Sequence, residues 1–336
     1  MPLALACLIA LASGYLLTRR IRALAEATGT LDVPNERSSH SVPTPRGGGA
    51  SFVLVTLAAA TYVAANAPSR QFGMYVVCAL AVAAISLTDD IRPMPAGIRL
   101  LAHVGAASLF VAIAPPFDAF RFLPSAVVLG AMVLWIVSLT NIFNFMDGID
   151  GIAACQAVIT FAAMGTYAAT IPDRALTAVC FIAASATVGF LGLNWPPARI
   201  FMGDVGSAFL GFSCGCLSVI RGDFCLAAVA LFATWPFIFD ATVTMFRRVS
   251  KGENILRSHR SHFYQRLAIE GYSHRFITIS YAGAAFLSAC VGLMACWKVI
   301  SFWSAASVLA VLSFVLLLFV RRAESRSPVV SEGSGH

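Results

Sequence analysis

The pattern that decides the fold is seen in residues 122–151, FLPSAVVLGAMVLWIVSLTNIFNFMDGIDG, where a long apolar run leads directly into two aspartates. A helix of about 17–25 mainly apolar residues is enough to cross a bilayer. Carboxylates are costly inside the hydrocarbon, so we expect this run to form a membrane helix with Asp147 and Asp150 at its aqueous end. The rest of the chain repeats this alternation of apolar runs and short polar connections.

Composition supports a membrane protein. Apolar residues make up 59% of the chain and charged residues 12%, and the mean hydropathy is +0.81. A soluble globule cannot bury so much apolar surface. Eleven runs are candidate spans, at 1–18, 50–67, 71–88, 98–115, 122–142, 152–171, 174–193, 203–220, 224–246, 275–296 and 299–320. The sequence predicts an all-α, polytopic integral membrane protein with about eleven transmembrane helices, a single transmembrane domain over 1–322 and a disordered tail over 323–336.

The positive charges predict the orientation. With eleven spans, 18 of the 23 Lys and Arg fall on one side of the membrane. The five on the other side are Arg70, Arg121, Arg174, Arg221 and Lys298. The positive-inside rule then places the N-terminus on the outer, periplasmic side and the C-terminus in the cytoplasm. The net charge of +7 is thus a topology signal, and no nucleic-acid partner is expected.

Four polar clusters fall on this inner side. They are Asp89-Asp90 in SLTDDIRP, Asp147 and Asp150 in NFMDGIDG, Asp204 in FMGDVGS, and His259 and His262 in SHRSHFYQRL. Carboxylates gathered at one face of a membrane protein indicate a bound metal ion. The neighbouring arginines and histidines favour a phosphate-bearing ligand. Together the clusters predict an enzyme that acts on an anionic substrate.

The NFMDGIDG segment is the most specific of these motifs. Asp147 and Asp150 are one helical turn apart, and Asn144 adds an amide on the preceding turn. Such oxygen ligands suit Mg²⁺. A helix cap followed by a turn would explain one aspartate but not the whole set. For Asp89-Asp90, a solvated helix end with Arg92 as counter-charge is an equally good interpretation.

Two glycine-rich segments point to phosphate or nucleotide contacts. Asp204 lies in a glycine-flanked turn that opens a helix, where N–H groups are available to an anion. Phe201 is a candidate stacking platform for a base, although an interfacial aromatic anchor is the more common role. Arg46 precedes three glycines in TPRGGG, which resembles a phosphate cradle without the ending of a P-loop.

The longest inner loop, 257–267, is basic. His259 and His262 alternate there with Arg257 and Arg260, so a helix would offer a basic face to phosphate, and zinc binding is disfavoured because no further ligand lies near. Asp240 lies within the ninth run, about two turns from the inner surface. An ionisable group at that depth is a functional candidate, and pairing with Arg247 is the alternative.

In their order along the chain, TPRGGG, LTDD, NFMDGIDG, FMGDVGS and the HRSH loop resemble the motifs of polyprenyl-phosphate N-acetylhexosamine-1-phosphate transferases. This family includes the phospho-N-acetylmuramoyl-pentapeptide transferases. The resemblance covers about residues 35–320. It implies transfer of a sugar-1-phosphate from a UDP-sugar to undecaprenyl phosphate, with Mg²⁺ (or Mn²⁺) as cofactor. It also implies a bacterial inner-membrane protein whose active site faces the cytoplasm.

The resemblance assigns roles to individual residues. As metal ligands it implies Asp204 and Asp150. As catalytic residues it implies Asp89, Asp90, Asp147, Asp150, His259 and His262, and as substrate-binding residues Arg46, Asn144, Asn194, Phe201, Arg257 and Arg260. Asn194 and Phe201 match positions that line the uracil pocket. Whether an aspartate acts as base or as nucleophile stays open, as does a homodimer.

The HRSH loop bears on the substrate. The muramoyl-pentapeptide branch has three consecutive histidines there, so His-Arg-Ser-His favours the branch that initiates O-antigen and other surface polysaccharides. UDP-N-acetylglucosamine is the first expected donor and UDP-N-acetylfucosamine the second. Membrane prenyltransferases and CDP-alcohol phosphotransferases are alternative enzymes with Asp-rich motifs. A secondary transporter is the non-enzymatic alternative, but its charges would lie near the midplane.

Overall fold

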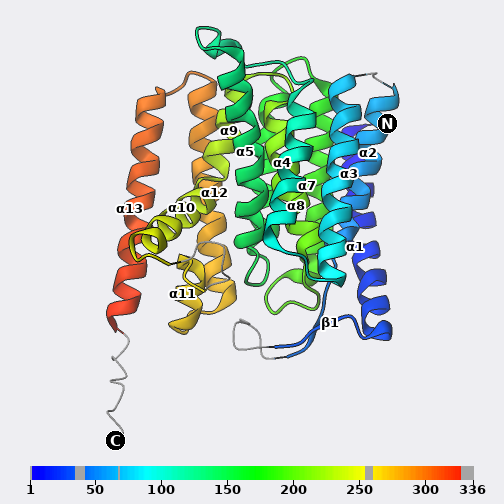
Figure 1. The fold of residues 1–336 in the computed structure, drawn as a ribbon, viewed down its shortest axis with the longest axis vertical. Helices are drawn as coiled ribbons and strands as arrows, with labels where there is room; N and C mark the ends of the chain where they lie inside the picture. Colours follow the sequence, from blue (N-terminus) through cyan, green and yellow to red (C-terminus); the bar gives the residue numbers. More distant parts are fainter. Residues whose placement is uncertain (1, 35–41, 67–68, 254–259, 327–336) are drawn as a thin grey trace, which may run out of the picture.

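The secondary structure is almost entirely helical. The computed structural model describes residues 2–34, 42–66, 69–253 and 260–326 (Figure 1). In chain order the elements are α1 (Leu3–Thr28), β1 (Leu31–Asp32), β2 (Thr44–Pro45), α2 (Ala50–Asn66), α3 (Arg70–Ile91), α4 (Ala96–Val111), the 3₁₀ turn η1 (Asp118–Phe120), α5 (Ser125–Phe145), α6 (Ile152–Ala168), α7 (Arg174–Asn194), α8 (Asp204–Val219), α9 (Phe224–Ala233), α10 (Trp235–Ser250), α11 (Phe263–Ile269), α12 (His274–Cys296) and α13 (Phe302–Arg326).

Each of the eleven predicted runs coincides with a helix or with a bent pair of helices. In the part of the chain that the structure describes, six helices are long and apolar enough to cross a membrane, and the count rises to seven if α9 and α10 form one span. Among the described residues, α2, α4, α6 and α8 are apolar but shorter. The all-α, multi-pass membrane character is thereby confirmed. The count of eleven spans and the side of each terminus stay predictions.

The run predicted as one span over 224–246 is broken. Helices α9 and α10 meet at an angle of 68°. The break falls at Thr234, whose hydroxyl donates to the carbonyl of Ala230 at 2.7 Å, and Pro236 lies in the first turn of α10. Proline suits a first turn because it has no N–H to offer the preceding residues. Figure 1 shows α10 leaving the bundle obliquely toward α13.

The remaining long helices pack side by side, and small residues allow the closest approach. Helix α1 lies against α7, where a Cβ added at Gly14 would be 2.4 Å from the carbonyl oxygen of Ala186. A Cβ at Gly189 would be 2.3 Å from that of Leu11. Without a hydrophobic force between helices in lipid, such close backbone packing is a main source of association.

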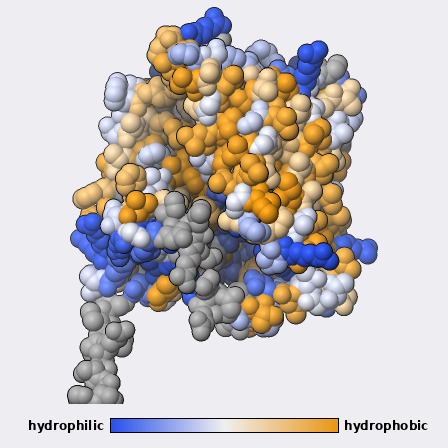
Figure 2. All heavy atoms as spheres, in the orientation of Figure 1, coloured by the Kyte–Doolittle hydropathy of each residue, from blue (hydrophilic) through white to orange (hydrophobic). Residues whose placement is uncertain are grey.

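One end of the bundle is polar. In Figure 2 hydrophobic residues cover the middle of the molecule, and hydrophilic ones lie at both ends, with the larger groups at the lower end. This polar end holds the β1–β2 hairpin, the end of α3, the start of α8 and α11 (Figure 1). The hairpin is joined to the loop before α8, because Gly48 N–H donates to Phe201 O and Gly49 N–H to Met202 O, both at 2.9 Å. The TPRGGG and FMGD motifs therefore lie together.

Candidate active site

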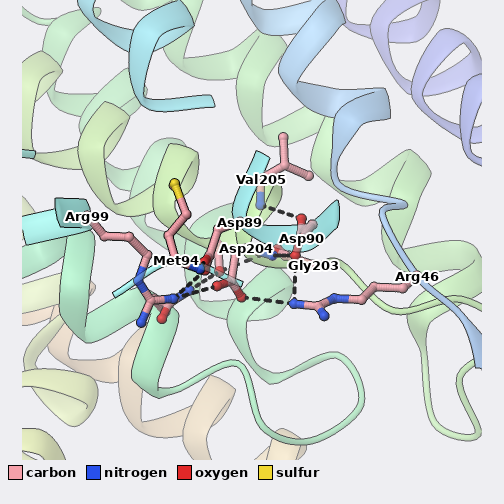
Figure 3. A network of polar contacts seen from close by, with 10 residues as sticks. Arg46, Asp89, Asp90, Met94, Arg99, Gly203, Asp204 and Val205 are labelled. Carbon is pink, nitrogen blue, oxygen red and sulfur yellow. Dashed lines mark hydrogen bonds and ion pairs between the residues drawn. The ribbon is translucent and has the colours of Figure 1, made fainter. Parts of the chain in front are cut away.

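Three predicted aspartates meet at the polar end, between α3 and α8 (Figure 3). The carboxylate of Asp90 accepts the backbone N–H of Asp204 at 2.9 Å and that of Val205 at 3.0 Å. These are the first two residues of α8, whose N–H groups have no partner within the helix. A carboxylate at this position is favoured by hydrogen bonding and by the helix dipole. The LTDD motif thus anchors the start of α8 beside the end of α3.

The residue before Asp204 has to be glycine. Gly203 has φ 76° and ψ 166°, a region that residues with a side chain avoid. A Cβ at this position would lie 2.8 Å from Oδ2 of Asp90. Both the backbone turn and the close approach of Asp90 therefore depend on the missing side chain.

Two arginines flank the carboxylates from opposite sides (Figure 3). Nη2 of Arg46 lies 2.6 Å from Asp90 Oδ1 and 3.3 Å from Asp204 Oδ1. Nη1 of Arg99, in α4, pairs with Asp89 and lies 3.1 Å from Asp204 Oδ2. Burial alone would lower the pKa of Arg46, but the carboxylates of Asp90 and Asp204 raise it overall. Each oxygen of Asp204 therefore faces one guanidinium group.

Sequence reasoning counted Arg99 only as a topology charge. Its position one turn inside α4, on the side of the four clusters, was the signal that could have identified it. Its guanidinium pairs with one oxygen of Asp89, and the other oxygen of Asp89 accepts the N–H of Met94, in the segment between α3 and α4, at 2.6 Å. Arg99 is thus a site residue that the motifs did not indicate.

The NFMDGIDG turn lies next to this cluster. Asn144 donates from Nδ2 to the hydroxyl of Ser207 at 3.1 Å, which ties the end of α5 to α8. The pKa of Asp147 is well above its usual range, first because the carboxyl is buried and then because Asp204 is near. Arg46 offsets only part of this repulsion. Burial and the charge of Asp204 therefore both favour the protonated form of Asp147 when no cation is bound beside it.

This donor set fits a divalent metal in its chemistry. Within the part of the chain that the structure describes, no three His, Cys, Asp or Glu side chains form a ready-made metal group. Instead the two arginines occupy the oxygens of Asp204. Carboxylate oxygens are what Mg²⁺ prefers, and it takes one or two of them together with water and substrate phosphate. Asp204 and the carboxyl groups of the adjoining Asp147 turn offer oxygens of this kind.

Two other predicted residues hold the surrounding loops. Oδ2 of Asp150 accepts the N–H of Ala198 at 3.0 Å and lies 3.4 Å from Nδ1 of His274. Buried Asn194 accepts the N–H of Gly151 at 3.0 Å and donates to the carbonyl of Ile200 at 2.9 Å. Both residues therefore connect the NFMDGIDG turn with the loop before α8.

Phe201 lies in that same loop, and its N–H donates to the carbonyl of Pro45 at 2.8 Å. Its side chain is partly buried, so the structure joins it to the hairpin while its predicted stacking role stays a prediction.

The basic loop reaches the site through α11. His262 is buried at the start of α11, with Nδ1 3.2 Å from Oδ1 of Asp240. Arg260 is partly buried beside it, while Arg257 and His259 lie outside the described residues. The alternative pairing of Asp240 with Arg247 is replaced by contacts to α11 and α12. Sequence reasoning gave Asp240 no partner in this loop.

Comparison with known proteins agrees with the motif order. The sequence model of glycosyl transferase family 4 matches residues 72–222. A probable undecaprenyl-phosphate N-acetylglucosaminyl 1-phosphate transferase of Bacillus subtilis is 29% identical over 97% of this chain and 92% of its own length. A decaprenyl-phosphate N-acetylglucosaminephosphotransferase of Mycolicibacterium smegmatis is 29% identical over 81% of this chain and 77% of its own.

A third relative carries the same kind of name. An undecaprenyl-phosphate alpha-N-acetylglucosaminyl 1-phosphate transferase of Yersinia pestis is 27% identical over 81% of this chain and 79% of its own. A phospho-N-acetylmuramoyl-pentapeptide-transferase of Listeria welshimeri is 27% identical but matches only 48% of this chain. The motif order, the family model over residues 72–222 and the long alignments all show that the chain is similar to glycosyl transferase family 4.

Proposed function

We propose that this protein transfers an N-acetylhexosamine-1-phosphate from a UDP-sugar to undecaprenyl phosphate, giving undecaprenyl-diphosphate-sugar and UMP. The observation that carries the proposal is the convergence of Asp89, Asp90 and Asp204 with Arg46 and Arg99 at the polar end of a membrane bundle. The names of the long-matching relatives support the polyprenyl phosphate acceptor and N-acetylglucosamine as the sugar.

The reaction brings two anions together, and the site is arranged to reduce their repulsion. Mg²⁺, or Mn²⁺ in its place, would be held by Asp204 together with Asp150 and Asp147 of the adjoining turn, and it would neutralise charge on the diphosphate and on the departing UMP. Arg46 and Arg99 supply guanidinium donors, which bind phosphate oxygens well. Asp89 and Asp90 hold these two guanidinium groups in place and are also our candidates for positioning the lipid phosphate.

The activity is tested by release of UMP from a panel of UDP-sugars. We expect UDP-N-acetylglucosamine to be turned over only when polyprenyl phosphate and Mg²⁺ are both present, with EDTA abolishing the reaction. UDP-N-acetylfucosamine is the second donor to compare, and UDP-N-acetylmuramoyl-pentapeptide is expected to be inert. UMP release without lipid, or transfer from a CDP-alcohol instead, would contradict the proposal. A role in initiating O-antigen or another surface polysaccharide follows from such a product.

We further propose that the polar end faces the cytoplasm, with the shorter helices also crossing and the N-terminus outside. The bias of 18 of 23 positive charges supports this orientation. After the nine native cysteines are replaced, single cysteines within 92–97 or 195–199 are expected to resist an impermeant thiol reagent in intact cells. Those within 119–121 are expected to react. A permeant reagent that labels both sets is the control, and labelling of 195–199 from outside would overturn the orientation.

A further inference from the structure

A single buried carboxylate, that of Asp240 in α10, collects five hydrogen-bonding groups. The side chain of Asp240 has no exposed surface. Its partners are the N–H of Phe263 at 2.9 Å, the N–H of Tyr264 at 3.3 Å, the hydroxyl of Tyr281 at 2.6 Å, the hydroxyl of Thr244 at 3.1 Å and Nδ1 of His262 at 3.2 Å. A buried carboxylate is costly unless it is well hydrogen-bonded, so this complete set of partners holds Asp240 in one position.

Two of these partners fix where α11 begins. Phe263 and Tyr264 are its first two residues, and N–H groups there have no acceptor inside the helix. Asp240 supplies that acceptor from α10, which lies more than twenty residues earlier in the chain. With only seven residues, α11 has little stability of its own, so its position depends on such tertiary contacts.

The contact with His262 fixes the state of the imidazole ring. A carboxylate accepts but does not donate, so Nδ1 carries the hydrogen at this contact. Two aromatic rings also contact the imidazole. It stacks with Phe145, with centroids 6.4 Å apart, and with Tyr264, with centroids 5.9 Å apart.

Tyr264 carries the connection to the Asp147 turn. Its hydroxyl donates to the carbonyl of Phe145 at 2.9 Å. A Cβ at Gly148 would lie 2.1 Å from that same hydroxyl oxygen. Tyr264 is therefore packed directly on the turn between Phe145 and Gly148, which bears Asp147.

We infer that Asp240 is a positioning residue of the site: it sets the start of α11, fixes the tautomer of His262 and holds Tyr264 against the Asp147 turn. This inference rests on the proposed transferase function. Asp240 touches no substrate and acts through His262 and Tyr264. The bend at Thr234 has a function in this arrangement, because it directs α10 away from the bundle and brings Asp240 to α11 (Figure 1).

The test replaces Asp240 by asparagine, which keeps the shape but exchanges one of the two accepting oxygens for an NH₂ group that cannot accept from its donors. We expect kcat to fall by between about 10-fold and 100-fold, the range typical when the partner that orients a functional histidine is changed. The KM for the UDP-sugar should change little. The matched control is Asp223→Asn at the opposite end, since Asp223 likewise accepts from a helix-start N–H, at 2.8 Å from Leu226, and from a tyrosine hydroxyl. A kcat for Asp240→Asn equal to that of the control would overturn the inference.

Coupling decides whether Asp240 acts through α11. In a His262→Ala or a Tyr264→Phe background, Asp240→Asn should lower kcat by a much smaller factor than it does in the wild type. The reason is that substitutions of residues that work as a unit are not additive in their effects. If Asp240→Asn lowered kcat by the same factor in both backgrounds as in the wild type, the positioning role would be contradicted. If Asp240→Asn does not accumulate, Tyr281→Phe provides the same comparison, since it removes one 2.6 Å bond and leaves the carboxylate in place.

A measurement independent of activity separates this inference from the proposed function. Amide hydrogen exchange over 260–269 should increase in Asp240→Asn and stay as in the wild type for Asp223→Asn. Unchanged exchange in Asp240→Asn would overturn the anchoring of α11. A wild-type protein that transfers no sugar phosphate would refute the proposed function, while the exchange result would still decide how α11 is held.

Discussion

Replacing Asp204 by asparagine is expected to abolish transfer and leave the fold intact. Asp204 lies at the start of α8, with one oxygen toward Arg46 and the other toward Arg99. Loss of its charge would misplace the metal and leave the charge of the diphosphate uncompensated. Charge stabilisation by a metal lowers the free energy of the transition state by several kcal/mol, so we expect the rate to fall by roughly 10³-fold. UMP release by the purified variant and its thermal unfolding temperature are the two measurements.

Asp173→Asn is the matched control for this experiment. Asp173 caps the start of α7 by accepting the N–H of Leu176 at 2.9 Å, and it pairs with Arg221 at 2.5 Å. It is therefore also a carboxylate at a helix start with an arginine partner, but it lies at the end of the bundle away from the site. The control should keep its activity. Near-normal transfer by purified Asp204→Asn would refute its role as the metal ligand.

Gly203→Ala is expected to cause the second largest loss, although it adds a single methyl group. The substitution forces alanine into φ 76°, ψ 166° and puts its Cβ 2.8 Å from Asp90 Oδ2. Backbone strain of this kind costs about 1–3 kcal/mol. Relief of the clash would displace Asp90 from the start of α8, and a displacement of about 1 Å near reacting groups can lower the rate 10²-fold. We therefore expect activity to fall at least about that much.

Gly29→Ala is the control that separates the effect of backbone strain from the effect of the clash with Asp90. Gly29 also has a positive φ, 71°, but nothing lies within 4 Å of a Cβ added there. It should lose some stability and keep its activity. If both variants lose activity equally, general destabilisation would explain the result, and the claim that activity depends on the close approach of Gly203 to Asp90 would be refuted.

Much of the architecture could be predicted from the sequence because hydrophobic burial in a membrane is a local property. A run such as 122–142 has to be helical and apolar to satisfy its backbone in lipid, and the structure has α5 there. Aspartates at the ends of such runs have to lie outside the hydrocarbon. The same argument placed Asp89, Asp147 and Asp204 at one end, where the structure brings them together.

The break at Thr234 could not be predicted from hydropathy. The apolar pattern continues through it, so hydropathy predicted one straight span over 224–246. The presence of Pro236 was compatible with either a straight or a bent path, and packing of α10 toward α11 and α13 decided between them.

The partners of the polar groups were decided only by the tertiary structure. Arg46 meets Asp204 across 158 residues of chain, and Arg99 meets it across 105. For Asp240 a local pairing with Arg247 was the alternative to a functional role, yet its carboxylate accepts from the first N–H groups of α11. Apolar residues need only to be out of water, so their pattern along the chain is sufficient. A buried polar group needs a particular partner at hydrogen-bond distance, and that partner exists only once distant segments have packed.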